Sequence, residues 1–401
     1  MKELIIDSGA AMTRALRVDD GVVTDCWLGA AVGDEQQANF VSIGDVFGAR
    51  VVKIDRTLRI GFLQLGARPD DPGGVLRFGP KASLPDEGAL IGVEVRTLAR
   101  AGKGHIVHWR REMAPTEPGR LTAAKHPFLE ACDGLFETVS PDKILVTTGR
   151  DKAIAQGALN IDTDLIDVSA TAFSDHQGPQ ILSELFARVI ALPSGGQITI
   201  DETEGMSVID VDTHQAGSNS KTGLNDKVNR QAAAVIICAL KMRRIAGQVL
   251  IDFLPTDKRK FNDWDRWVHD QFSELTGIGN QSWTKSGIFS FTLPRTQPSV
   301  LERFTRTSKE APVPGRLFTQ DASLAFALCD FEDRLRTSSQ PLRLNLSPDL
   351  YQHYVANPDF ADRLAQCYGV VNVICEAPLL QQREFEIVES PREEHGSLPD
   401  L

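Results

Sequence analysis

The spacing of hydrophobic and polar positions divides the chain into stretches of different character. At the N-terminus the apolar positions favour strands at residues 3–7, 13–18 and 22–28. Asp19-Asp-Gly21 stands between the second and third of these strands and is typical of a hairpin turn. Residues 1–38 are therefore predicted to form a strand-rich piece of the protein, to which we assign no chemistry.

Short alternating strands continue after residue 39, with no helical period between them. They cover residues 45–54, 58–65 and 89–98, and glycine-containing turns separate them. This pattern is typical of a small OB-type barrel, which we predict for residues 39–111. An aromatic beside a cation on a barrel face suits single-stranded nucleic acid. From spacing alone, however, Phe62 fits a core position and Lys103 fits a loop.

Helical and strand patterns alternate over residues 112–191. Helices are expected at 127–139, 151–159 and 177–192, and strands at 143–147 and 165–168. The last helix has a clear period of about 3.6 residues, with apolar residues at positions 181, 182, 185, 186, 189 and 190. We expect these elements to form an α/β unit together with residues 1–38.

Carboxylates interrupt two apolar runs in the middle of the chain. In Val208-Ile-Asp-Val-Asp212, Asp210 and Asp212 are two residues apart, so on a strand both point to one face. Asp252 interrupts Val249-Leu-Ile251 in the same way, and an amphipathic helix at 228–240 connects the two strands. An ionised carboxylate in apolar surroundings is costly unless it is paired or binds a metal. Asp210 and Asp252 together would call for a cation, for which Mg²⁺ is suited. A carboxylate that caps a strand end beside solvated neighbours is an equally good interpretation of the spacing.

The rest of the chain adds a helix and a small C-terminal unit. Residues 261–275 have a helical period, with Trp264, Trp267 and Phe272 expected in the core. The C-terminal unit is expected to extend from 342–346 to 385–388. Helices near 348–356 and 358–368 are expected between two strands, one of which is 370–374. The tail at 390–401 is polar and is expected to be disordered.

Composition narrows the class of protein. The chain has 401 residues, 42% hydrophobic and 24% charged, which is ordinary for a globular protein of roughly two to four domains. No apolar run is long enough to span a membrane, and the six cysteines form no Cys-x-x-Cys pair, so neither a zinc site nor a disulfide framework is indicated. The net charge of −11 argues against a surface that binds nucleic acid all over, but is compatible with a local basic track. We expect a cytoplasmic protein.

Several motifs resemble the ribonuclease E/G family. They are Leu192-Pro-Ser-Gly-Gly196, Thr203-Glu204, Val208-Ile-Asp-Val-Asp212, Val249-Leu-Ile-Asp-Phe253 and Lys285-Ser-Gly-Ile-Phe-Ser-Phe-Thr-Leu-Pro-Arg295. The resemblance implies an α+β multidomain fold, in which an OB-fold RNA-binding barrel interrupts an RNase H-like domain. A DNase I-like catalytic domain and a small α/β C-terminal domain would follow. The implied boundaries are 1–38 and 112–191 for the RNase H-like domain, 39–111 for the barrel, 192–305 for the catalytic domain and 306–389 for the small domain.

The resemblance also implies roles for single residues. Asp210 and Asp252 fall on the ligands of a Mg²⁺ ion, which Mn²⁺ could replace, and Asp212 falls on a catalytic position where the family usually has asparagine. Phe62 falls on an aromatic that stacks on RNA bases, and Lys103 falls on a basic RNA contact. The implied function is a Mg²⁺-dependent endoribonuclease that hydrolyses phosphodiester bonds in single-stranded RNA, in rRNA or mRNA processing or decay.

The chain departs from the family pattern at several places. Asp70-Asp-Pro-Gly-Gly74 replaces the barrel's second aromatic, and the segment and the arginine that sense a 5′ monophosphate have no counterpart. Ala311-Pro-Val-Pro-Gly-Arg316 stands where the family has a two-cysteine zinc link. We therefore expect no 5′-monophosphate sensing, no zinc and no zinc-linked tetramer, and instead a monomer or homodimer. A C-terminal scaffold region is not expected either.

Two other functions stay open at this point. One is an RNA-binding factor of the same fold with little or no nuclease activity, which Asp212 and the missing aromatic favour. The other is a different phosphoryl hydrolase that uses the same carboxylates. The pair Asp210 and Asp252 argues against the first, because a binding module needs no such pair. The predicted barrel argues against the second.

Overall fold

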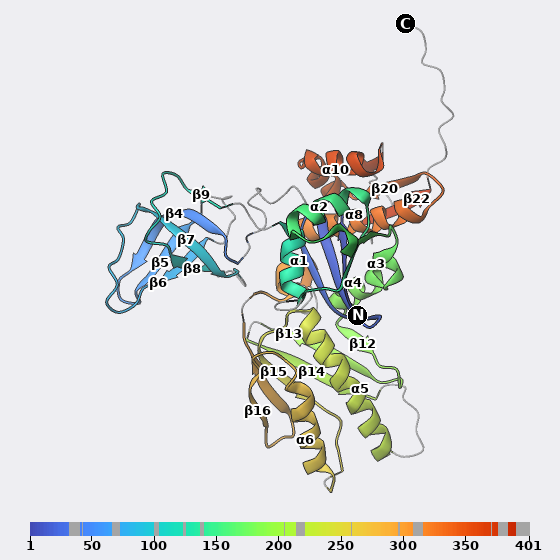
Figure 1. The fold of residues 1–401 in the computed structure, drawn as a ribbon. Helices are drawn as coiled ribbons and strands as arrows, with labels where there is room; N and C mark the ends of the chain where they lie inside the picture. The colour runs from blue at the N-terminus through green and yellow to red at the C-terminus, as the bar shows by residue number, and fades with distance from the viewer. Residues whose placement is uncertain are drawn as a thin grey trace. The chain divides into compact units, whose positions relative to one another are not determined.

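The computed structural model describes most of the chain (Figure 1). The described residues are 1–31, 41, 43–65, 73–99, 104–122, 126–136, 140–203, 205–213, 221–257, 259–295, 297–307, 316–369, 371–375 and 384–389. They belong to two compact units, one made of Met1–Glu35, Lys125–Pro179 and Phe304–Leu401, the other of Gln36–Ala124 and Gln180–Arg303. Lys103 and the tail at 390–401 lie outside the described residues.

A five-stranded sheet forms the centre of the first unit, in the order β11-β10-β1-β2-β3. Its strands are β1 (Lys2–Ser8), β2 (Met12–Asp19), β3 (Val22–Ala30), β10 (Lys143–Val146) and β11 (Ile166–Val168). Strands β1, β2 and β3 are antiparallel neighbours, whereas β10 runs parallel to β1. The strands predicted at 3–7, 13–18 and 22–28 are confirmed, as are those at 143–147 and 165–168.

Helices α1 (Pro127–Phe136) and α2 (Gly149–Leu159) bury their apolar sides against this sheet (Figure 1). Phe128 and Leu135 of α1 and Ala155 of α2 share one buried cluster with apolar side chains of β1 and β10. Thr148 caps α2, because its hydroxyl accepts a hydrogen bond from the Asp151 N–H. The short elements η1 (Thr163–Leu165) and α3 (Ala172–Asp175) follow along the chain.

The same unit contains a three-stranded sheet in the order β21-β20-β22. It consists of β20 (Leu342–Leu346), β21 (Asn372–Cys375) and β22 (Phe385–Glu389), and helices α9 (Pro348–Val355) and α10 (Pro358–Tyr368) follow β20. These elements agree with the prediction. The chain enters this region through β18 (Thr305–Thr307), β19 (Arg316–Phe318) and the helix α8 (Gln320–Thr337), and α8 was not expected from the sequence.

A cluster of buried charges joins α8 to the N-terminal strands. Arg14 of β2, 2% exposed, donates hydrogen bonds to Asp7 of β1 and, at 2.7 and 2.9 Å, to Asp333 of α8. Arg336 of α8 lies 2.7 Å from the other carboxylate oxygen of Asp7. Burial alone would raise the pKa of Asp7, but Arg14 and Arg336 outweigh it and hold that pKa below its ordinary value. With Glu332, these four residues form what we call the charge cluster.

Glu332 gives the charge cluster a dependence on pH. The residue is buried in α8, and both of its carboxylate oxygens lie 3.1 Å from the Ala10 N–H, which donates to them. Burial raises the pKa of Glu332 to about 7, although the charge of Arg336 opposes the shift. The folded protein therefore holds this proton more tightly than the unfolded chain does.

We expect the ionisation of Glu332 to lower the free energy of unfolding as the pH rises from about 5 to about 8. The sign follows because the folded pKa lies above the ordinary value of 4.5, so ionisation of Glu332 is costly only in the folded state. Glu332→Gln should lessen this fall and should raise stability at about pH 8 by about 1–3 kcal/mol. Urea unfolding of both proteins at the two pH values measures the effect. Equal pH dependence in the two proteins would contradict it.

The second unit contains a closed barrel of five strands. These are β4 (Val46–Asp55), β5 (Ile60–Gln64), β6 (Gly74–Arg77), β7 (Leu90–Thr97) and β8 (His105–Trp109), with the short β9 (Gly119–Arg120) beside β4. The order is β5-β6-β8-β7-β4, and β4 also pairs with β5, which closes the ring. Phe47, Val51, Leu63 and Val93 are among the residues that fill its interior. Such a barrel fits an OB-like domain, as predicted from the sequence.

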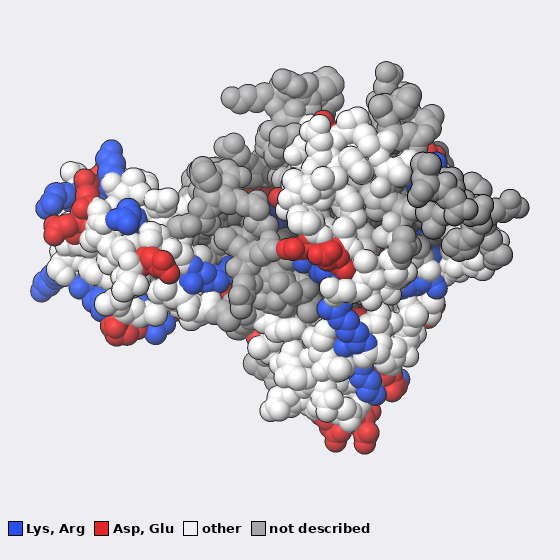
Figure 2. Space-filling model, turned by 90° about the horizontal axis from the view of Figure 1, so that it is seen from above, with Lys and Arg blue, Asp and Glu red and all other residues white. Residues whose placement is uncertain are grey.

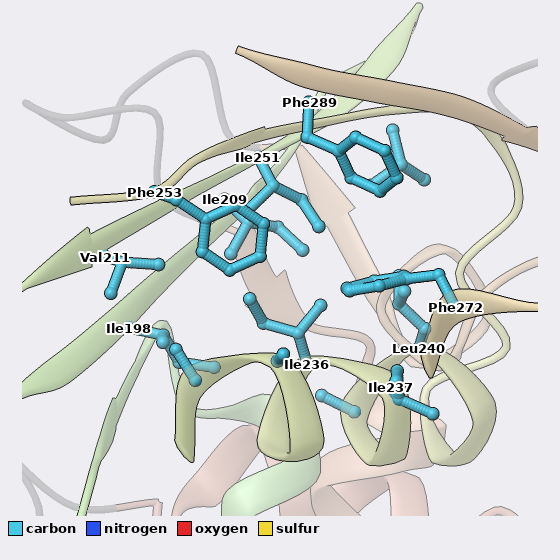
Figure 3. Close-up of a cluster of buried hydrophobic side chains, with 14 of the residues drawn as sticks. Ile198, Ile209, Val211, Ile236, Ile237, Leu240, Ile251, Phe253, Phe272 and Phe289 are labelled. Carbon is cyan, nitrogen blue, oxygen red and sulfur yellow. The ribbon is translucent and has the colours of Figure 1, made fainter. Parts of the chain in front are cut away.

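The same unit contains a six-stranded sheet in the order β12-β13-β14-β15-β17-β16. Its strands are β12 (Val189–Ala191), β13 (Gln197–Glu202), β14 (Met206–Asp212), β15 (Gly247–Asp252), β16 (Gly279–Trp283) and β17 (Phe289–Leu293). Helices α5 (Lys221–Met242) and α6 (Phe261–Phe272) cover one face, and α7 (Val300–Phe304) follows the last strand (Figure 1). Figure 3 shows Ile209 and Ile251 of the sheet meeting Ile236 of α5 and Phe272 of α6 in the core.

The predicted helix at 177–192 is wrong in its last part. Helix α4 (Gly178–Phe186) ends at Phe186, and Val189–Ala191 form β12, which pairs antiparallel with β13. Val189 and Ile190 fit a helical period, but β-branched residues also favour strands, and the pairing with β13 decides the outcome. None of the described helices is long and apolar enough to cross a membrane.

Candidate active site

Two carboxylates lie side by side on the six-stranded sheet. Strands β14 and β15 are parallel neighbours, and their register sets Asp210 directly opposite Asp252. Neighbouring strands are about 4.8 Å apart, so two such side chains can reach one ion. The structure thus brings together the two residues that the sequence led us to expect at one site, while their roles stay predictions.

The alternation of both strands turns these side chains away from the core. Ile209 and Ile251 are buried under α5 and α6, whereas Asp210, Asp212 and Asp252 alternate with the buried positions and are exposed. The sequence suggested carboxylates inside buried strands. In the structure, α5 and α6 cover one face of the sheet, and the carboxylates lie on the other face. They therefore avoid the cost of full burial.

The carboxylates repel one another. Partial burial, and after it the charges of Asp252 and Asp212, raise the pKa of Asp210 above its ordinary value. A divalent cation between Asp210 and Asp252 would relieve this repulsion. The arrangement therefore favours cation binding at these residues.

The donor set fits a hard cation that keeps part of its hydration shell. Within the described ranges, no three His, Cys, Asp or Glu side chains form a group that could hold a metal ion. Mg²⁺ is commonly held by one or two carboxylates together with waters and substrate phosphate oxygens, so the pair of carboxylates fits it.

Polar side chains of β13 continue the row of carboxylates. Thr199 lies opposite Asp210, and Gln197 lies opposite Asp212. Neither residue was identified from the sequence. Their signal is the alternation of β13, in which polar residues interleave with the buried Ile198.

A buried asparagine on α5 was also missed. Asn229 has no exposed surface and exchanges two hydrogen bonds with the backbone of Leu254, close after Asp252 in the chain. Its signal in the sequence is a polar residue on the apolar side of a helix, since Ala233 and Ile236, one and two turns further on, are buried.

The predicted RNA contacts belong to the barrel. Phe62 of β5 points outward and is 45% exposed, so it is not a core residue. It pairs with Lys53 of β4 and Val75 of β6, and Val75 pairs with Ile106 of β8, which gives an apolar row beside a lysine on the outer face. Lys103 lies outside the described residues, so its position near Phe62 stays a prediction.

Charge on the barrel surface is mixed. Figure 2 shows Lys and Arg interspersed with Asp and Glu over the barrel, at the left of the view, rather than one large basic patch on the face shown. Nucleic-acid binding through this face would thus depend on stacking and on a few local cations.

Comparisons with known proteins point to one family. Residues 152–274, which include Asp210, Asp212 and Asp252, match the Ribonuclease E/G family model. Ribonuclease E of Haemophilus influenzae is 38% identical over 85 residues, 20% of this chain and 9% of that protein. Ribonuclease E of Escherichia coli is 36% identical over 85 residues, 20% of this chain and 8% of that protein. For Ribonuclease E of Synechocystis the values are 41% over 75 residues, 18% and 11%.

Each of these matches thus spans about a tenth of the relative's length. The family model covers the crossover from β14 through α5 to β15, where the two carboxylates meet. In this segment, the chain is similar to the ribonuclease E/G family.

Proposed function

We propose that this protein is a Mg²⁺-dependent endoribonuclease that hydrolyses phosphodiester bonds in single-stranded RNA. The observation that carries the proposal is the register of β14 and β15, which sets Asp210 opposite Asp252 on an accessible face within the segment that matches the family. The relatives named Ribonuclease E support RNA as the substrate. Mn²⁺ accepts the same oxygen ligands and could replace Mg²⁺.

Hydrolysis of an RNA phosphodiester needs an activated water and neutralisation of the negative charge that develops on the phosphate. Mg²⁺ supplies both effects when bound, since it acidifies water and acts as a Lewis acid. Asp210 and Asp252 provide the anionic oxygens that would hold it. Asp212, on the same face, accepts hydrogen bonds and could orient the attacking water. Because water attacks, the products would carry a 5′ phosphate and a 3′ hydroxyl.

Asp212 also supports a second candidate function. The family usually has asparagine at this position, and the charge of Asp212 contributes to the raised pKa of Asp210. An additional negative charge repels the RNA phosphate and removes a hydrogen-bond donor. The second candidate is therefore an RNA-binding factor of the same fold with little or no nuclease activity.

We assign RNA capture to the barrel and chemistry to the six-stranded sheet. Phe62 would stack on a base, and Lys103 would contact the RNA backbone. In this proposal the RNase H-like domain comprises 1–38 and 112–191, the DNase I-like catalytic domain 192–305, and the small C-terminal domain 306–389. The protein would act in the cytoplasm, in RNA processing or decay, as a monomer or homodimer.

Cleavage of a short single-stranded RNA tests the proposed function. We expect cutting in Mg²⁺, none in EDTA, and equal rates on RNA with a 5′ monophosphate or a 5′ hydroxyl, because the 5′-sensing residues have no counterpart. A strong preference for the monophosphate would refute the loss of 5′ sensing but not the nuclease. RNA that is bound but stays uncut in Mg²⁺ would favour the RNA-binding factor.

A further inference from the structure

We propose that Asn229 is a positioning residue. From helix α5 it fixes the chain just after Asp252 and thereby sets how tightly the pair Asp210 and Asp252 binds its divalent cation. This inference rests on the proposed function of that pair. It concerns a residue that would touch neither the cation nor the RNA.

Asn229 lies among apolar side chains, yet both its amide oxygen and its amide nitrogen form hydrogen bonds. Its Oδ1 accepts a hydrogen bond from the Leu254 N–H at 3.0 Å, and its Nδ2 donates one to the Leu254 carbonyl at 2.9 Å. A buried amide is costly unless both of its polar ends are satisfied. Here both hydrogen bonds are formed with the backbone of one residue, Leu254. They replace the pair of hydrogen bonds that the backbone of a neighbouring strand would form with it.

Within the described ranges, the strand ladder of β15 ends at Asp252. On the β14 side its last pair is Asp210 with Asp252, and on the β17 side it is Ile251 with Phe289. The side-chain amide of Asn229 takes over the pairing two residues further on. Asp252 is therefore the last paired residue of β15, and a second fixed point follows two residues later at Leu254.

Two further contacts hold the same short segment. Between the two fixed points, Phe253 packs edge-on against Trp264, with ring centroids 5.4 Å apart. One turn before Asn229, Asn225 donates from Nδ2 to the Pro255 carbonyl at 2.9 Å. Asparagines four residues apart lie on one side of a helix. Helix α5 therefore holds both Leu254 and Pro255.

This geometry predicts an effect on metal affinity. Some residues orient a metal ligand without touching the metal themselves. Replacing such a residue typically changes metal affinity or activity by about 10–100-fold. Asn229→Ala leaves the Leu254 backbone without its side-chain partner, so the segment after Asp252 is held less tightly. The pairing of β14 with β15 remains, but the position of the Asp252 carboxylate is less fixed. The carboxylates themselves remain.

Thermal unfolding of the full chain at increasing Mg²⁺ concentrations tests the inference, because a cation that binds the folded protein raises the unfolding temperature. We expect Asn229→Ala to raise the apparent Kd for Mg²⁺ by about 10-fold or more. Asn225→Ala loses a single, more exposed hydrogen bond, so we expect it to change the Kd in the same direction by less than about 10-fold. This variant serves if Asn229→Ala does not fold. RNA cleavage at low Mg²⁺ should fall in parallel and recover toward the native rate at saturating Mg²⁺.

Asn345→Ala is the matched control. Asn345 is 2% exposed in the other compact unit and accepts a hydrogen bond from Arg343 Nε at 3.0 Å, so its loss should lower stability and leave the Mg²⁺ affinity unchanged. A Mg²⁺ shift that Asp252→Asn abolishes, but that both asparagine variants of α5 retain with the native Kd, would overturn the role of Asn229 alone. No Mg²⁺ shift in the native protein, together with no cleavage, would overturn the proposed function and this inference with it.

Discussion

Replacing Asp252 by asparagine should lower the rate of RNA cleavage by about 10³-fold or more, because a bound metal ion contributes several kcal/mol of charge stabilisation in the transition state. The amide that replaces the carboxylate would keep one oxygen but lose the charge that, with Asp210, favours a cation. Single-turnover cleavage of single-stranded RNA at saturating protein and Mg²⁺ measures the rate. RNA affinity, measured separately, should change little, since RNA capture is assigned to the barrel.

The electrostatics of the site predict that this loss is not caused by unfolding. Asp252 is one of the charges that raise the pKa of Asp210, so removing it should leave the folded protein at least as stable without Mg²⁺. Asp210→Asn and the double variant should be about as inactive as Asp252→Asn alone, since residues that act as one unit are not additive.

Asp201→Asn is the control for a carboxylate elsewhere on the sheet. Asp201 lies in β13 and forms an ion pair with Arg188 at 2.6 Å, on the surface. We expect near-native cleavage for this variant. Native rates in both Asp252→Asn and Asp201→Asn would show that the pair of carboxylates is not the catalytic site.

Local patterns predicted the strands of the site but not the way in which they are held. The period of two in β14 and β15 shows from the sequence alone that Asp210 and Asp212 share a face, because alternation is a property of a single strand. That Asp210 lies opposite Asp252 depends on the pairing of two strands across α5. Asn229 is a further step away, since its partner is a backbone group and leaves no pattern in the sequence.

Alternatives that the sequence left open could be decided only by tertiary context. Val189 and Ile190 fit the period of α4 and also a strand, and the antiparallel pairing with β13 selects the strand. Phe62 fits a core position or an exposed one, and its place on β5 makes it exposed. In each case the choice depends on a neighbouring strand that no local window contains.

The charge cluster shows the same limit most clearly. Asp7 and Arg14 lie near the N-terminus, and Glu332, Asp333 and Arg336 lie in α8, which belongs to the last third of the chain. A charged residue within an apolar strand is the only local sign of the cluster, and it does not name its partners. The five residues become one structure only when α8 packs against the N-terminal strands.

Arg14→Ala should therefore lower the free energy of unfolding by about 3–5 kcal/mol, the cost of leaving buried charges without their partner. Arg14 loses its bonds to Asp7 and Asp333, and also its place 4.3 Å above the ring of Phe173. Asp7 remains fully buried, with Arg336 as its remaining arginine. Urea unfolding at about pH 7, followed by far-UV circular dichroism, measures the difference.

Arg17→Ala gives the matched comparison from the same strand. Arg17 is partly exposed, pairs with Asp19 at 3.0 Å and donates a hydrogen bond to the Leu135 carbonyl at 2.9 Å, so its loss should cost about 1–2 kcal/mol, less than the loss of Arg14. Because Arg14 keeps the pKa of Asp7 low, Asp7 in the Arg14→Ala protein should take up its proton at a higher pH. The stability that the ionised Asp7 contributes above its unfolded pKa is present in the native protein and is lost as the pH falls through the lowered value. In the variant this loss should begin at a higher pH. If the free energy of unfolding of the variant equals that of the native protein at pH 7 and falls at the same acid pH, Arg14 does not hold α8 to the N-terminal sheet.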